Sequence, residues 1–177
     1  MNLIFDNQLS IFEDIFYKYL TPKQCTKLYT SNLILYNIYL INNKFEDYYF
    51  MPKTDIELNN AVNIWCNNRE EAILKYGHIS FWNTIKITNM QSIFQKKFYF
   101  IDDISDWNTS NVYNMAQMFS YTYNFNQPLN YWNTSNVTNM SYMFCNSTKF
   151  NQPLDNWDTS NVFTMYGMFY STENFFS

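Results

Sequence analysis

The chain has 177 residues, of which 47% are hydrophobic and 21% aromatic, and this composition excludes a disordered protein. It contains only two glycines, Gly77 and Gly167, which argues against a glycine-rich phosphate loop or a dinucleotide-binding fingerprint. The formal net charge of −4 gives no basic footprint, so we expect no nucleic-acid partner.

Residues 1–45 are predicted to form a small helical unit. Leu9, Phe12, Phe16 and Leu20 have helical spacing, and a helix start at Thr21-Pro22 leads into a second amphipathic run. The stretch from Phe16 to Leu28 resembles the F-box, the short helical module that docks on the Skp adaptor of cullin-type ubiquitin ligases. A plain helical cap is the alternative. The resemblance implies adaptor-binding residues, namely Phe12, Phe16, Leu20, Pro22 and Leu28.

Residues 46–81 are predicted to form a helical cap that leads into the repeats. The capping box Thr54-Asp-Ile-Glu57 marks the start of a helix from Asp55 to about Cys66. A second helix is expected from Asn68 through Tyr76. The apolar face of the first helix has the spacing i, i+3, i+4 and i+7, in Leu58, Ala61, Val62 and Trp65.

Residues 82–177 are a tandem repeat. Four tryptophans recur at one constant interval without an insertion, at Trp82, Trp107, Trp132 and Trp157. The last three repeats continue with Asn/Asp-Thr-Ser-Asn-Val and a Met-x-x-Met-Phe block, and Phe-Asn-Gln-Pro-Leu recurs at 125–129 and 150–154. A period of this length is typical of a solenoid, in which each repeat stacks on its neighbours.

Within one repeat, Val112, Met115 and Phe119 fall at i, i+3 and i+7, which predicts a short helix with Ser110 as its N-cap. The alternation of apolar and polar residues over 125–129 predicts a strand. The sequence therefore favours an α/β fold, a short solenoid of 25-residue repeats preceded by a small helical N-terminal unit.

The repeat phrases carry a resemblance to a known family. Asp158-Thr-Ser-Asn-Val162, Asn139-Met-Ser-Tyr-Met-Phe144 and Phe125-Asn-Gln-Pro-Leu129 resemble the BspA-type leucine-rich repeat, also described as a mycoplasma lipoprotein-associated repeat family of unknown function. The resemblance covers about residues 54–177. It implies a leucine-rich-repeat-like architecture and a role in protein binding, and it supplies no catalytic residue.

Residue types that carry chemistry are sparse. His78 is the only histidine, and it has no acid or cysteine at a triad or metal-ligand spacing. We expect it to be structural. The three cysteines are odd in number and widely spaced, so buried thiols are expected, and the acids at 102–106 are expected to form a solvated edge. The sequence therefore predicts neither an enzyme nor a metal or other cofactor.

The leading interpretation is a non-catalytic protein-protein interaction scaffold, with a substrate-recruiting adaptor role in a cullin-type ubiquitin ligase as its extension. A structural or surface-associated repeat protein is the alternative. Specificity in stacked repeats lies where the repeats differ, which indicates partner-binding positions at Tyr113, Gln117, Thr138, Tyr142 and Phe163. The sequence does not identify the partner.

Location and self-association are two further expectations. The N-terminus lacks the basic and apolar regions of an export signal, and no run of eighteen apolar residues occurs, so we expect an intracellular, cytoplasmic protein without a membrane partner. Residues 174–177 align with 124–127, inside the predicted strand. We therefore expect an uncapped C-terminal repeat that either self-associates or frays locally.

Overall fold

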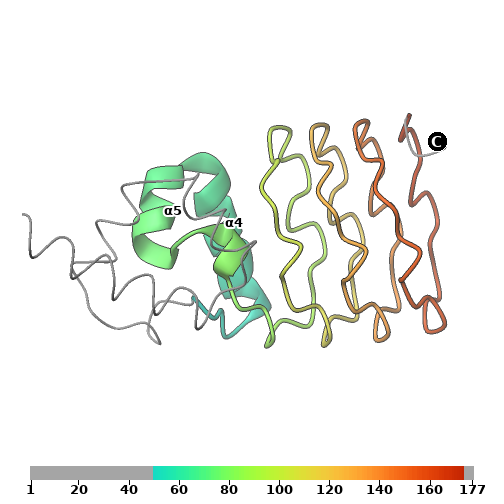
Figure 1. The fold of residues 1–177 in the computed structure, drawn as a ribbon, viewed down its shortest axis with the longest axis horizontal. Coiled ribbons are helices and arrows are strands. Elements are labelled where there is room, and N and C mark those ends of the chain that lie inside the picture. The colour runs from blue at the N-terminus through green and yellow to red at the C-terminus, as the bar shows by residue number, and fades with distance from the viewer. Residues whose placement is uncertain (1–49, 174–177) are drawn as a thin grey trace, which may run out of the picture. The chain divides into compact units, whose positions relative to one another are not determined.

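The structure is a computed structural model that describes residues 50–173. The predicted helical unit over 1–45, with its five adaptor-binding residues, lies outside the described residues. Helix α4 (Asp55–Asn67) is followed by α5 (Arg69–Tyr76) and by the short 3-10 helix η1 (Ile79–Phe81). The repeats then lie side by side in chain order (Figure 1). None of the helices within 50–173 has the length and apolar character needed to span a bilayer.

Both predicted helices are present, and polar side chains cap them. The Thr54 hydroxyl accepts a hydrogen bond from the Glu57 N–H at 3.1 Å at the start of α4. Glu57 reaches back to the N–H of Lys53 at 2.7 Å, one residue earlier than in a standard capping box. Asn68 caps α5 by accepting from the Glu71 N–H at 3.3 Å. The buried face of α4 is the predicted one, Leu58, Ala61, Val62 and Trp65.

The prediction of an α/β solenoid is wrong. Among the described residues, the repeats contain neither a helix nor a strand, and only isolated parallel bridges join Asn89, Asn114, Asn139 and Thr164. The segment expected to be a helix is a run of overlapping turns, in which Met118 bonds back to Met115 and Ser120 to Gln117. Gln117 and Tyr121 take positive φ angles of 57° and 61°, which interrupt any helix.

The other repeats have the same backbone. Positive φ recurs at the two equivalent places of each repeat, at Ser92, Lys96, Gln117, Tyr121, Tyr142, Asn146, Gly167 and Ser171.

Ser110 is not a helix cap, because its N–H and hydroxyl both donate to Asn108 Oδ1, at 3.0 and 2.7 Å. Residues 125–129 form no strand either, and Leu129 instead accepts from the N–H of Trp132 in a turn.

A ladder of backbone hydrogen bonds joins successive repeats. The N–H groups of Met115, Gln117, Phe119 and Tyr121 donate to carbonyls of the next repeat, at 2.8 to 2.9 Å. The N–H groups of residues 90, 92, 94 and 96 and of residues 140, 142, 144 and 146 repeat this pattern. These N–H groups are used between repeats, so they are not available for the i to i−4 bonds of a helix.

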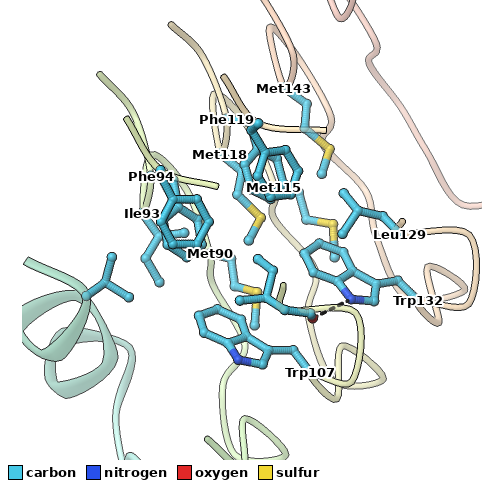
Figure 2. Packing of buried hydrophobic residues seen from close by; sticks show 14 of the residues in the cluster. Met90, Ile93, Phe94, Trp107, Met115, Met118, Phe119, Leu129, Trp132 and Met143 are labelled. Carbon is cyan, nitrogen blue, oxygen red and sulfur yellow. Dashed lines mark hydrogen bonds between the residues drawn. The ribbon is translucent and has the colours of Figure 1, made fainter. Parts of the chain in front are cut away.

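The repeat phrase supplies a second set of hydrogen bonds between repeats. The Trp132 indole N–H donates to the Ile104 carbonyl at 3.2 Å, drawn as a dashed line in Figure 2. The Thr109 hydroxyl donates to the Asn133 carbonyl at 2.9 Å, and the Asn136 amide donates to the Ser110 carbonyl at 2.7 Å. The tryptophan, threonine and asparagine of the phrase therefore have structural roles.

The core is built from residues at equivalent positions of successive repeats, which we call columns. In one column Phe94, Phe119, Phe144 and Phe169 stack with ring centroids 5.5 to 5.6 Å apart and interplanar angles of 2° to 6°. Figure 2 shows Phe94 and Phe119 with Met90, Met115 and Met118 of the same two repeats and with the rings of Trp107 and Trp132. Val112 and Val137 are fully buried, and the equivalent Val162 is partly buried against the core.

Helix α4 joins the first repeat through Asp102 and Asp55. The Asp102 carboxylate accepts from the Trp65 indole N–H at 2.9 Å and from both terminal nitrogens of Arg69, at 2.6 and 2.8 Å. Asp55 Oδ1 accepts from the backbone N–H groups of Thr88 and Asn89, at 2.9 and 3.2 Å. The expectation of a solvated acidic edge is therefore wrong for Asp102, whose side chain is largely buried in this junction.

Replacing Phe144 by alanine is expected to lower the free energy of unfolding by about 3–5 kcal/mol, because the fully buried ring loses its stacking partners on both sides. Urea unfolding measures this loss. Tyr131→Ala is the matched control, because that ring is 87% exposed and its loss is expected to change stability by no more than about 0.5 kcal/mol. Equal losses in the two variants would contradict the packing described.

Replacing Asp102 by alanine is expected to lower the free energy of unfolding by about 1–3 kcal/mol, because the buried Trp65 indole N–H loses its acceptor. The guanidinium of Arg69 is nearly half exposed, so the ion pair adds little. Asp102→Asn keeps an acceptor for Trp65 and should lose less, while the exposed Asp106→Ala is the control. Thermal melts compare the three variants; an asparagine variant as unstable as the alanine variant would overturn this ranking.

Candidate protein-interaction surface

The polar side chains of the junction are engaged in structural contacts. His78 Nδ1 lies 2.8 Å from the Ser80 hydroxyl, and its ring meets the Trp65 ring edge-on at 4.9 Å. Asp103 Oδ1 accepts from the Ser105 N–H at 2.8 Å. Within residues 50–173, no three His, Cys, Asp or Glu side chains are grouped closely enough to hold a metal ion. His78 has the structural environment that the sequence predicts.

The two described cysteines are free thiols. Cys145 is buried in the third repeat and Cys66 is half-buried on α4. Burial raises the pKa of the Cys66 thiol to about 11, with a smaller opposing effect from the Lys97 ammonium. The thiol stays protonated near neutral pH and is a poor nucleophile there. Cys25 lies outside the described residues.

In each repeat, a run of turns (residues 113–121 in the second repeat, after its Thr-Ser-Asn-Val phrase) directs every fourth side chain outward. In the second repeat Met115, Met118 and Phe119 are fully buried, whereas Tyr113 and Tyr121 are exposed and Gln117 is half-buried. The equivalent residues of the other repeats form three outer columns, which run across the stack. The first contains Thr88, Tyr113, Thr138 and Phe163; the second Ser92, Gln117, Tyr142 and Gly167; the third Lys96, Tyr121, Asn146 and Ser171.

Three of the predicted partner-binding residues share the first outer column. The Thr138 N–H donates to the Tyr113 carbonyl and the Phe163 N–H donates to the Thr138 carbonyl, each at 2.8 Å. Tyr113 is 48% exposed and Phe163 is 90% exposed. The backbone therefore holds two large aromatic side chains in solvent, two repeats apart, with Thr138 between them.

The other two predicted residues, Gln117 and Tyr142, lie in the second outer column and are less accessible. Gln117 Oε1 accepts from the Ser92 hydroxyl at 3.3 Å. Tyr142 packs edge-on against Tyr166, with ring centroids 5.3 Å apart, and its ring fills the space that a Cβ at Gly167 would need. Both residues are partly committed to contacts within the stack, so the first outer column is the more accessible part of the predicted set.

A second exposed aromatic group was missed by the sequence reasoning. Phe98 and Tyr123 stack with ring centroids 5.3 Å apart, and Tyr121 meets Tyr123 edge-on at 6.2 Å. These three residues are named the aromatic edge. They lie outside the recurring phrases, and the first two repeats alone carry aromatic residues at these positions, which is the signal that could have identified them.

A known protein family matches the chain over the capping helices and all four repeats. Residues 53–177 match the family described as "Mycoplasma protein of unknown function, DUF285". No curated protein and no solved structure matches the chain. The match agrees with the predicted mycoplasma repeat family and does not extend to a BspA-type leucine-rich repeat or to an F-box. Because it covers most of the sequence, the chain belongs to the DUF285 family.

Proposed function

We propose that this protein is a non-catalytic scaffold that binds another protein through the outer columns of its repeats. The observation that carries the proposal is the exposure of Tyr113 and Phe163 on one column, at 48% and 90%. Large aromatic side chains give much contact area for little conformational entropy, and they dominate the binding energy of many protein interfaces.

The backbone beneath these side chains supports the same role. Ladder hydrogen bonds and stacked rings join each repeat to its neighbours, so an outer side chain is presented from a fixed position. A preorganised surface loses less entropy on binding than a flexible loop does. The residues that differ between repeats at these outer positions would set specificity, since the inward residues are committed to packing.

The resemblance of residues 16–28 to an F-box extends the proposal. Such a segment would link the scaffold to a Skp-type adaptor, and the repeats would then recruit a substrate of a cullin-type ubiquitin ligase. A link of this kind implies an intracellular, cytoplasmic location. The repeat phrases also resemble BspA-type repeats, a family with a role in protein binding. This likeness supports the proposed binding of a partner protein.

A photo-crosslinking amino acid placed at position 113 or 163 is expected to give discrete protein adducts in cells, because these side chains are the accessible anchors. Position 74 is the matched control, since Leu74 is an exposed apolar residue on α5. Adducts are identified by mass spectrometry and the complex is then reconstituted from purified components. There the double variant Tyr113→Ala/Phe163→Ala is expected to weaken affinity by tenfold or more, equivalent to about 1.4 kcal/mol.

The outcome of this experiment separates the two classes of function. Adducts that are equally abundant at positions 74, 113 and 163, or absent from all three, would contradict the scaffold and favour a structural or surface-associated repeat protein. Unchanged melting temperatures of the double variant are required, because both side chains lie outside the core.

The full chain is expected to co-purify with a Skp-type adaptor when the two are co-expressed, and Leu20→Asp is expected to abolish this, because a charge would replace an apolar contact residue. Ile56→Asp is the matched control, since Ile56 is an exposed residue on α4. Size-exclusion chromatography with quantified band intensities measures the complex. Failure of the wild-type chain to bind would remove the adaptor role and leave a helical cap, without affecting the proposed outer-column surface.

A further inference from the structure

The aromatic edge is a preformed apolar surface that no other side chain of the described residues covers fully. Phe98, Tyr121 and Tyr123 are each between 36% and 41% exposed although they pack against one another. Their backbone is fixed by the ladder, in which the Tyr121 N–H donates to the Cys145 carbonyl at 2.8 Å. The rings are therefore ordered before any partner binds, which lowers the entropic cost of association.

Two lysines bracket the aromatic edge along the direction of stacking. Lys96 precedes Tyr121 in the third outer column, and its N–H donates to the Ser120 carbonyl at 2.9 Å. On the other side the N–H of Lys149 donates to the Tyr123 carbonyl at 3.3 Å. Both side chains are exposed, and neither ammonium pairs with a carboxylate within residues 50–173. Lys97 differs, because its ammonium donates to Asn63 Oδ1 at 2.7 Å.

Charge is segregated on the stack. The segments 95–99, 120–124 and 145–149, which form this edge, contain three lysines and no acidic residue, although the chain as a whole carries a net charge of −4. Acidic side chains gather at 102–106 and 155–158, and in the fourth repeat the exposed Glu173 stands at the position of Phe98 and Tyr123. Over the first three repeats the aromatic edge thus carries lysines without acids, and a local positive charge of this kind favours an anionic partner.

We infer that the aromatic edge is the docking site for an acidic peptide segment of a partner protein, in which an apolar residue lies between carboxylates. The apolar residue would pack on Tyr123 and Phe98, and the carboxylates would pair with the ammonium groups of Lys96 and Lys149. This inference rests on the proposed scaffold function and assigns the chemistry of its partner. A nucleic acid fits less well, because two of the rings already stack on each other and are not open to intercalating bases.

The inference is tested with the full chain and three fluorescein-labelled probes of about twelve residues or nucleotides. The first is a peptide with a central Tyr-Pro pair flanked by glutamates, the second has lysines in place of the glutamates, and the third is oligothymidylate. Fluorescence anisotropy is expected to show saturable binding of the acidic peptide alone. Raising the salt concentration from about 50 mM to about 500 mM should weaken this binding, because exposed charge pairs are screened.

Four variants locate the site. Lys96→Glu/Lys149→Glu and Tyr123→Ala are each expected to weaken binding of the acidic peptide by tenfold or more. Lys86→Glu and Tyr131→Ala are the matched controls, since both residues are exposed on the same stack outside the aromatic edge, and they should change affinity less than twofold. Thermal melts establish that each variant folds.

Several outcomes would overturn the inference. These are absence of acidic-peptide binding at millimolar concentration, preference for oligothymidylate, or equal effects of the edge variants and their controls. If crosslinking at positions 113 and 163 still captures a partner, only the assignment of the aromatic edge fails. If neither experiment detects binding, the scaffold function fails with it.

Discussion

The structure depends on the hydrogen bonds that run from the N–H groups of one repeat to carbonyls of the repeat that follows it in the chain. Four such bonds join each pair of repeats over the turn segment, and all four point in the same direction. They fix the register between repeats, so that each phenylalanine ring stacks on the equivalent ring of the next repeat, as Trp82 stacks on Trp107. A constant repeat length without insertion is therefore a requirement of the ladder, since one extra residue would move every inward side chain of the next repeat out of its column.

Each repeat depends on its successor for burial. Met90, Met115 and Met140 are fully buried beneath the following repeat, whereas the equivalent Met165 is 45% exposed. The other side of the first repeat is covered by the helices. Asp55 of α4 accepts hydrogen bonds from two N–H groups of that repeat, and α4 also contributes Trp65 to the core. The stack is thus a chain of nearest-neighbour interfaces, and stability is shared between repeats.

The sequence predicted the inward residues and both capped helices, and it mispredicted the backbone of the repeats. Val112, Met115 and Phe119 lie inside as expected, yet this spacing arises from a run of turns as well as from a helix. The positive φ angles that distinguish the two fall mostly on residues such as Gln117 and Tyr142, whose types carry no signal for that conformation. Asp102 was misjudged because its partners, Trp65 and Arg69, lie far earlier in the chain, beyond any local pattern.

The candidate surface could be predicted only in part for a related reason. The recurring residues are those that the ladder and the core require: the Trp132 indole, the Thr109 hydroxyl and the Asn136 amide all bond to the backbone of a neighbouring repeat. Positions that differ between repeats do not form these bonds, and many of them face solvent. Comparing the repeats therefore indicated that Tyr113 and Phe163 would be exposed. The aromatic edge escaped that comparison because its rings come from two repeats and meet only after stacking. A partner that contacted two adjacent repeats would therefore meet a combination of side chains that neither repeat carries alone.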